Sequence, residues 1–217
     1  MFPEELVEFR KGTIDPGVSD EWIWPKTDQG AWEGPLMNWL SDGNKYSQCY
    51  DTRFFQHVKH YNTVITAGAN CGLYTRVYAH KFKNVYAFEP HWLNFYCLTR
   101  NCPEKHVYKF NCALSNSSGV QSLYECDNTN MGMYKLIEGE SNLKVPKITI
   151  DSLNLDWCDL IQLDVEQHEA EVIEGALETI KKFKPVIIVE TLYKPELITD
   201  LGYKLEVGNG DQIYFYE

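Results

Sequence analysis

The sequence predicts a doubly wound α/β fold built on a mostly parallel sheet. Strand-like and helix-like segments alternate through most of the chain, which is the pattern of such folds. The segment 185–190 is continuously apolar up to its final glutamate, as expected of a strand covered on both faces of a parallel sheet. A β-branched run at 63–67 breaks into a turn containing Gly68 and Gly72 and then resumes with helical spacing. Such sheets bind ligands at the carboxyl ends of their strands, so this turn marks the expected binding edge.

The first predicted elements surround the glycine turn. A helix is predicted over 50–60 and a strand over 63–67. Beyond the turn, apolar residues at helical spacing predict a helix of roughly ten residues. A second strand at 84–89 ends on a carboxylate. Pro90 then opens a helix at 91–101, since proline is tolerated in a first helical turn.

The middle of the chain is predicted to be largely extended. Strands are expected at 107–112 and 121–126. Residues 127–143 are rich in Asn, Gly and Met and are predicted to form a mobile loop. The segment 145–150 is extended, and its proline favours an edge position in a sheet.

The last part of the chain returns to strand and helix alternation. A strand at 158–166 runs into a carboxylate-rich end. One helix should follow it, because a single apolar stripe is formed by Val172, Ile173, Ala176, Leu177 and Ile180. After the strand at 185–190, a short helix is expected near 194–200. Two closing strands at 203–207 and 211–216 are joined by a Gly-Asn-Gly-Asp turn, which favours a β-hairpin.

The chain of 217 residues is long enough for one α/β domain with a small extension. Residues 1–50 lack a sustained period and are dense in Trp, Pro and Gly, so they are predicted to form an irregular, aromatic-rich N-terminal cap on a domain at 51–217. Aromatic rings in such a cap either anchor it to the core or stack on a ligand. The candidates for substrate contacts are Trp22, Trp24, Lys26, Asp28 and Trp32.

Composition narrows the expected partners. The net charge of −11 and the pI near 5.0 argue against nucleic acid, whose binding depends on clustered Lys and Arg. We find no apolar run long enough for a bilayer and no signal-peptide pattern at the start, so we expect a cytoplasmic protein that does not bind a membrane. The 7 cysteines are scattered without a CxxC pair, which indicates free, mostly buried thiols. No pattern indicates an oligomeric state.

The expected binding edge gathers the glycine turn and several carboxylates. Glu89 lies about 20 residues after Gly68, the interval at which an acidic residue binds ribose hydroxyls in nucleoside-binding α/β folds. Such a turn suits a ligand held on main-chain N–H groups, because glycine allows close approach. The full GxGxxG pattern of dinucleotide sites is missing. We therefore favour a nucleoside without phosphate, such as S-adenosylmethionine.

Five segments in order resemble the FkbM-type S-adenosylmethionine-dependent methyltransferases. They lie between about residues 62 and 190, and the first 50 residues are outside the resemblance. The glycine turn resembles the VIDVGANxG segment of that family. The carboxylate-rich strand end resembles its IKIDVEGxE signature. The quoted segments are VITAGANCG at 64–72, YAFEP at 86–90, ALS at 113–115, TIDSL at 149–153 and IQLDVEQHE at 161–169.

The resemblance implies a Rossmann-like, mostly parallel seven-stranded sheet of the class I methyltransferase type, ending in a C-terminal β-hairpin. It implies that the ribose is bound by Glu89, the adenine by the backbone near Ala113 and Leu114, and the transferring methyl group lies near Asp164. Thr66 stands where the family has an acidic residue that helps to hold the cofactor's amino group. The methionine part would be held by Gly68, Asn70, Gly72 and Thr75.

Methyl transfer to a hydroxyl needs an in-line approach and a group that accepts the proton. Asp164, Glu166 and His168 are the catalytic candidates. Alternatively, the two carboxylates cap the next helix and His168 lies on its solvated face. These residues and Glu190 could also form a hard-metal site, so a divalent metal is possible but not expected.

Three positions depart from the family pattern. Thr66 stands in place of the acidic residue, Gln162 stands in place of a lysine, and Gln167 stands in place of a glycine. The change at Thr66 raises the alternative of a binding module that has lost turnover. The change at Gln162 removes a lysine that a Lys-Asp-Lys-Glu type of RNA 2′-hydroxyl methyltransferase would need.

The leading hypothesis is an O-methyltransferase acting on a hydroxyl of a sugar or another small polyol-like acceptor. Its biological role would then be glycan modification. Residues 20–40 and 127–143 are expected to shape the acceptor pocket. An NAD-linked oxidoreductase is a further alternative, and the missing third glycine of the turn argues against it.

Overall fold

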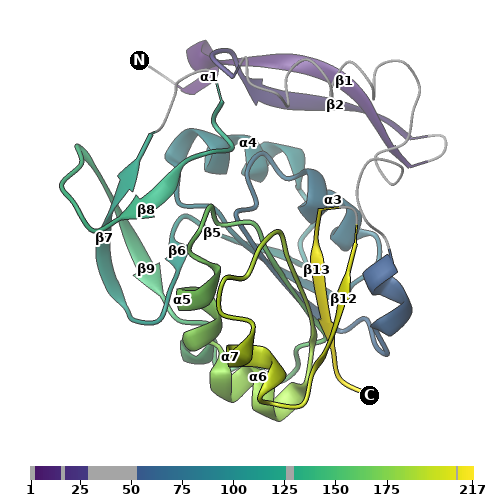
Figure 1. Ribbon diagram of the computed structural model, residues 1–217. Coiled ribbons are helices and arrows are strands. Elements are labelled where there is room, and N and C mark those ends of the chain that lie inside the picture. Colours follow the sequence, from purple (N-terminus) through teal and green to yellow (C-terminus); the bar gives the residue numbers. More distant parts are fainter. Residues whose placement is uncertain (1–2, 16–17, 29–52, 126–129, 209) are drawn as a thin grey trace.

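The computed structural model describes residues 3–15, 18–28, 53–125, 130–208 and 210–217. The main sheet has seven strands in the order β12–β13–β11–β10–β3–β4–β5. The strands from β11 to β5 pair in parallel, whereas β13 pairs antiparallel with both β11 and β12 (Figure 1). This confirms the predicted fold class and its C-terminal hairpin. The strands are β3 (Thr63–Ala67), β4 (Asn84–Phe88), β5 (Val107–Phe110), β10 (Leu160–Leu163), β11 (Val186–Val189), β12 (Lys204–Val207) and β13 (Gln212–Phe215).

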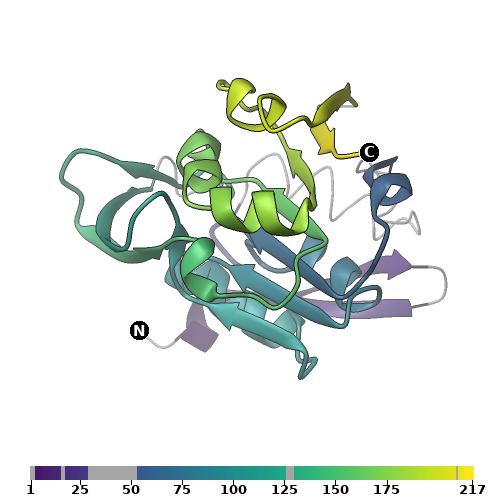
Figure 2. The same ribbon diagram turned by 90° about the horizontal axis from the view of Figure 1, so that it is seen from below.

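Helices cover both faces of this sheet. Successive residues of β3 point to opposite faces, so Val64 packs in one core with α4 and Ile65 in another with α5 and α6. Figure 2 shows α5 and α6 (green) and α4 (teal) on different sides of the strands. The helical segments are η3 (Arg53–His57), α3 (Leu73–Ala79), α4 (Trp92–Asn101), η4 (Asp151–Leu153), α5 (Glu169–Glu174), α6 (Leu177–Phe183) and α7 (Glu196–Thr199).

Two predicted helices differ from the observed ones. The helix predicted over 50–60 is a short 3-10 helix at Arg53–His57 within the described residues. The single helix predicted after β10 is divided into α5 and α6 at Gly175. A Cβ atom at Gly175 would collide with the main-chain oxygen of Ser115, and the Gly175 oxygen accepts a hydrogen bond from Asp151 N at 3.0 Å. Close packing of the backbone at Gly175 therefore interrupts the apolar stripe that predicted one helix.

A second sheet extends beyond β5, in the order β6–β9–β7–β8 (Figure 1). Its strands are β6 (Ala113–Leu114), β7 (Gly119–Tyr124), β8 (Lys135–Ile137) and β9 (Leu143–Ile148). The mobile loop predicted over 127–143 is wrong where β8 and the start of β9 pair with β7. The edge position predicted for 145–150 is also wrong, because β9 lies between β6 and β7. Pro146 is tolerated there because β6 pairs only with Lys147 and Ile148.

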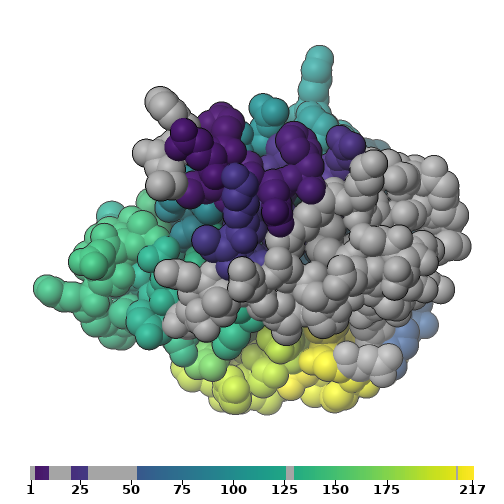
Figure 3. Space-filling view, turned by 90° about the horizontal axis from the view of Figure 1, so that it is seen from above, coloured from purple at the N-terminus to yellow at the C-terminus, as the bar shows by residue number. Residues whose placement is uncertain are grey.

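The N-terminal segment is partly regular, contrary to the prediction of irregular structure. A short helix α1 (Pro3–Leu6) leads into an antiparallel hairpin of β1 (Val7–Asp15) and β2 (Val18–Pro25). The side chain of Asn101 at the end of α4 fixes β2, accepting from Ile23 N at 2.8 Å and donating to Ile23 O at 2.9 Å. Figure 3 shows the hairpin, in purple, at the molecular surface. Most of the predicted cap beyond it, residues 29–52, lies outside the described residues.

Two further expectations concern the chain as a whole. Among the described residues, no helix is both long and apolar enough to cross a membrane. The described cysteines are free and buried, as the scattered positions predicted; they are Cys71, Cys97, Cys102, Cys112 and Cys158.

Candidate active site

A cavity of about 330 Å³ lies at the carboxyl ends of the central strands. The strand register explains which residues reach it. Phe88 of β4 is level with Ala67 of β3, which is level with Leu163 of β10, Val189 of β11 and Gln212 of β13. The next residue along this edge from each strand lines the cavity. In order across the sheet these are Glu89, Gly68, Asp164, Glu190 and Asp211, which we call the strand-end row.

The glycine turn fits tightly between its neighbours. Gly68 has a φ of 72°, and a Cβ atom there would collide with the main-chain oxygen of Asp164. Gly72 has a φ of 101°, and a Cβ atom there would lie 2.8 Å from Cys102 Sγ. Both positions therefore need glycine for backbone conformation and for space.

The main-chain N–H groups of the turn are occupied within the protein. Gly68 N and Ala69 N both donate to Phe88 O, at 3.1 and 3.0 Å, and Gly72 N donates to Ala69 O at 2.9 Å. Asn70 N donates to Glu89 Oε2 at 2.8 Å, and Cys71 N donates to Asn70 Oδ1 at 2.7 Å. The expectation that this turn carries a ligand on its N–H groups is therefore wrong. The N–H groups of residues 68–72 are therefore not free to bind a pyrophosphate.

Glu89 is a buried carboxylate at the edge of the turn. Its two oxygens accept main-chain N–H groups, one from Asn70 and one from His91, each at 2.8 Å. Burial raises the pKa of Glu89 from 4.5 to about 7, although these hydrogen bonds favour the charged form. Each carboxylate oxygen has a second lone pair, so Glu89 can still accept a hydrogen bond from a ligand in the cavity.

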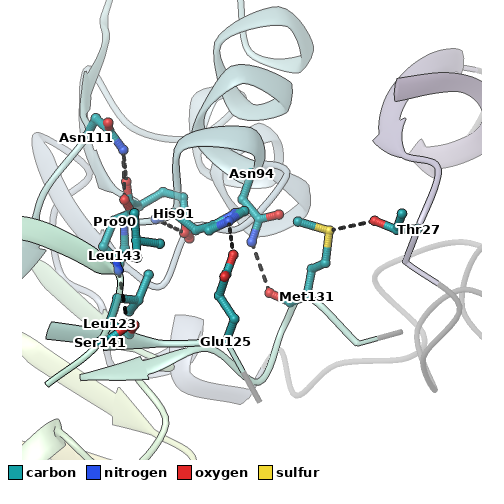
Figure 4. Close-up of polar contacts among 11 residues, drawn as sticks. Thr27, Pro90, His91, Asn94, Asn111, Leu123, Glu125, Met131, Ser141 and Leu143 are labelled. Atoms are coloured by element: carbon teal, nitrogen blue, oxygen red, sulfur yellow. Dashed lines mark hydrogen bonds and ion pairs between the residues drawn. The ribbon is translucent and has the colours of Figure 1, made fainter. Parts of the chain in front are cut away.

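Asn94 of α4 also lines the cavity and carries no motif that would identify it in the sequence. Its Nδ2 donates to the main-chain oxygen of Met131 at 3.0 Å (Figure 4). Its Oδ1 is buried and has no hydrogen-bond partner among the described residues. An unpaired buried acceptor is costly, so this oxygen calls for a donor from a ligand or from water.

The N-terminal candidates for substrate contacts differ in whether they line the cavity. Trp24 lines the cavity, and its Nε1 donates to Asp28 Oδ2 at 2.7 Å. Asp28 does not line the cavity, but its Oδ1 accepts from Met131 N at 3.4 Å, so it joins two parts of the wall. Trp22 is buried in the core beneath the hairpin, and the exposed Lys26 donates to Glu5 O at 2.8 Å. Neither of these two lines the cavity, and Trp32 lies outside the described residues.

Thr66 and Thr75 do not line the cavity either. The Thr66 hydroxyl donates to Gln162 Oε1, and these residues are level with each other on β3 and β10. The two departures from the family pattern are thus partners. A neutral hydrogen-bonded pair occupies positions at which the family has an acidic residue and a lysine. Thr75 is fully buried.

Asp164 and Glu166 lie on the loop that follows β10, and both line the cavity. Burial is the main cause that raises the pKa of Asp164 from 3.8 to about 7, and the charges of Glu166 and Glu190 add to it. Burial also raises the pKa of Glu166. The loop is conformationally demanding, because Glu166 and Gln167 have φ values of 54° and 74°.

His168 lines the cavity, and its Nε2 has a hydrogen-bond partner. Nε2 is 3.0 Å from Ser115 Oγ, and Nδ1 is 3.7 Å from Glu171 Oε2. Its side chain is 12% exposed, so it does not lie on a solvated face. Burial lowers its pKa, which favours the neutral ring. These contacts connect the loop after β10 to the end of β6.

The remaining walls are mainly apolar. Ala113 and Leu114 of β6 line the cavity together with Phe88 of β4. Leu123 of β7 and Leu136 of β8, which are level with each other, complete this side. Within the described ranges, we find no group of three or more His, Cys, Asp and Glu side chains placed to hold a metal ion.

Comparisons with known proteins show the family to which the chain belongs. A family model described as the methyltransferase FkbM domain matches residues 66–205. Curated proteins gave no match. Among solved structures, the chain is similar to a methyltransferase FkbM from Methylobacillus flagellatus, with a TM-score of 0.50 and 18% identity. That likeness covers 71% of this chain and 43% of the other, so this chain spans less than half of that protein's length.

Two more distant structures are also methyltransferases by description. The precorrin-6y C5,15-methyltransferase of Geobacter metallireducens has a TM-score of 0.45 and 13% identity, covering 75% of this chain and 83% of that one. The 16S rRNA N2 G1207 methyltransferase of T. thermophilus has a TM-score of 0.48 and 13% identity, covering 98% of this chain and 50% of that one. The family match extends over more than half of the sequence, and the chain therefore belongs to the FkbM methyltransferase family.

Proposed function

We propose that the protein binds S-adenosylmethionine in the cavity and methylates a hydroxyl group of a sugar or another small polyol-like acceptor. Membership of the FkbM family supports methyl transfer. The observation that carries the proposal is the strand-end row, in which Gly68 lies between the carboxylates Glu89 and Asp164. This arrangement offers a close backbone approach with a hydrogen-bond acceptor on each side.

The residues present fit this cofactor. The turn uses its N–H groups internally, as a ligand without phosphate allows. Glu89 has lone pairs for ribose hydroxyls, and Leu114 with Phe88 offers an apolar wall for a flat base. Asp164 supplies negative charge where the positively charged sulfur and amino group would lie. Thr66 is directed to Gln162 and does not line the cavity, so we assign it no contact with the cofactor.

When bound, S-adenosylmethionine supplies a methyl group on a positively charged sulfur. Transfer of this methyl group to the acceptor oxygen would leave the electron pair of the broken S–C bond on sulfur, and the hydroxyl would have to lose its proton. The hydroxyl proton passes to the carboxylate of Asp164. A base works best when its pKa lies near the working pH, and the pKa of Asp164 is raised to about 7. Asp164 is therefore our choice for the catalytic base.

His168 has a different part in this proposal. Because its Nε2 lies 3.0 Å from Ser115 Oγ and its Nδ1 faces Glu171, it is poorly placed to take a proton from the acceptor. It fixes the loop that carries Asp164 and Glu166 against β6. We therefore treat His168 as a positioning residue.

Neither alternative function gains a specific observation. The binding-module hypothesis depended on Thr66, and this side chain lies away from the cavity. An NAD-linked enzyme needs donors for a pyrophosphate, and the N–H groups of the turn have partners within the protein.

Transfer of a tritiated methyl group to a panel of sugars and polyols tests the proposal. We expect labelled product from at least one acceptor with the native chain, and little or none with Asp164→Asn, which keeps the shape of the side chain. Calorimetry should show that the variant still binds S-adenosylhomocysteine. Failure of the native chain to bind this product would contradict the proposal.

A further inference from the structure

Gln162 of β10 presents a side-chain amide to the cavity. It is one of the lining residues although it is only 4% exposed. Gln162 is level with Thr66 of β3, and it precedes Asp164 by two residues. Asp164 N donates to Ala67 O at 3.1 Å, which extends the ladder past β10, so Gln162 and Asp164 point to the same face of the sheet. Gln162 therefore lies directly below Asp164, where the strand-end row passes Gly68.

The oxygen end of this amide is fixed within the protein. The Thr66 hydroxyl donates to Gln162 Oε1, and Thr66 is itself fully buried. Gln162 Nε2 has no partner among the described residues, and it is not one of the unpaired side-chain atoms that are sealed from solvent. An amide whose oxygen is bound still offers two N–H donors at its other end. Gln162 therefore turns an oriented and unpaired donor toward the cavity.

The proposed cofactor carries a group that needs a donor at this place. The α-carboxylate of S-adenosylmethionine is attached to the same carbon as its amino group, which would lie near Asp164. Acidic side chains repel a carboxylate, and no lysine or arginine lines the cavity in the described ranges. The N–H groups of residues 68–72 bond within the protein. A side-chain amide beside Asp164 can supply the donor that these N–H groups do not.

We infer that Gln162 Nε2 binds the α-carboxylate of S-adenosylmethionine, and that Thr66 orients the amide by holding Oε1. The inference rests on the proposed function and adds a residue to its cofactor site. Gln162 contacts the cofactor directly, whereas Thr66 acts through Gln162 and is a positioning residue. The two departures from the family pattern then act together in cofactor binding.

Calorimetry on the full chain at pH 7 tests this inference with two ligands that differ in one group. S-adenosylhomocysteine carries the carboxylate. Its decarboxylated analogue, S-adenosyl-3-thiopropylamine, keeps the amino group and lacks the carboxylate. The variants are Gln162→Met, which keeps the length of the side chain without an amide, Thr66→Val, which removes the hydroxyl, and Thr66→Ser, which retains it. Gln121→Met is the matched control, because Gln121 of β7 lies outside the cavity. Thermal unfolding shows whether each variant is folded.

We expect the native chain to bind S-adenosylhomocysteine more tightly than the analogue. The acidic lining alone would give the opposite order, because the analogue is a cation and S-adenosylhomocysteine is a zwitterion. Gln162→Met should weaken binding of S-adenosylhomocysteine about tenfold or more and change binding of the analogue less than about twofold. Thr66→Val should reduce the preference in the same direction. Thr66→Ser and Gln121→Met should keep the native preference.

The inference is wrong if the analogue binds the native chain as tightly as S-adenosylhomocysteine or more tightly. It is also wrong if Gln162→Met leaves the preference for S-adenosylhomocysteine unchanged, which includes an equal loss of affinity for both ligands. A native preference in Thr66→Val would overturn the part assigned to Thr66. If neither ligand binds the native chain, the proposed function fails and the inference fails with it.

Discussion

Single residues decide how the cavity can act, because its acids differ in surroundings. Glu89 has two main-chain donors and lies next to the turn, whereas Asp164 lies among other carboxylates. Sequence patterns identified both positions. They could not identify Asn94 or Asp211, since one is placed by the helix α4 and the other by the antiparallel register of β13. They also named Thr66 as a candidate for cofactor binding, and its side chain bonds Gln162 and does not line the cavity.

The rate of methyl transfer should rise with pH through about 7. The pKa of Asp164 is raised to about 7, so below that pH the carboxyl group is protonated and cannot accept the hydroxyl proton. A pH–rate profile with a hydroxyl acceptor measures this directly. Asp164→Asn should lose the dependence on pH in this range together with about a hundredfold to ten-thousandfold in rate. A variant that retains the native profile would exclude Asp164 as the base.

Gln167→Gly should stabilise the protein by roughly 0.5–1 kcal/mol, as judged by urea unfolding. Gln167 has a φ of 74°, in which a side chain is strained and glycine is not. The control is Gln121→Gly in β7, where glycine should cost roughly 0.5–1 kcal/mol. Loss of stability in both variants would show that residue 167 is not strained.

At the scale of elements, the central strands could be predicted from the sequence, whereas the N-terminal hairpin and the break between α5 and α6 could not. The strands from β3 to β11 follow their apolar and β-branched runs closely. The hairpin was missed because Trp22, Ile23 and Trp24 are buried in succession, so β2 shows no alternation. Their burial comes from docking on α3 and α4, which is a tertiary effect. The break between α5 and α6 likewise depends on Ser115, which is distant in sequence.

The N-terminal hairpin should loosen when Asn101 is replaced. The Asn101 side chain bonds Ile23 N, Ile23 O and, at 2.7 Å, Cys71 O, so it connects the hairpin to the glycine turn. Asn101→Leu leaves these buried groups without partners and should cost roughly 2–4 kcal/mol. Hydrogen exchange should become faster at Ile23. Asn116→Leu, at an exposed site, should change stability by less than about 0.5 kcal/mol, and equal effects of the two would refute the connection.

At the scale of the whole molecule, the fold places a row of acids along one edge of the sheet. The protein without ligand should therefore lose stability as the pH rises from about 4 to about 7. The pKa values of Glu89 and Asp164 are raised from 4.5 and 3.8 to about 7, so the folded state binds more protons than the unfolded chain in this window. The stability that these two carboxyl groups contribute is fully present below the pKa values of the unfolded chain, 4.5 and 3.8, and is lost as the pH rises through 7.

Thermal unfolding across this pH window measures the effect. In the double variant Glu89→Gln, Asp164→Asn, the melting temperature should depend less on pH than it does in the native chain. A native melting temperature that rises steadily from pH 4 to pH 8, with the same slope in the variant, would mean that these carboxyl groups are not protonated in the folded state.

The most direct measurement is a crystal structure of the chain with S-adenosylhomocysteine. The account predicts ribose hydroxyls bound to Glu89, the sulfur directed toward Asp164 and no contact with Thr66. Binding outside the cavity, or with the ribose directed away from Glu89, would contradict it.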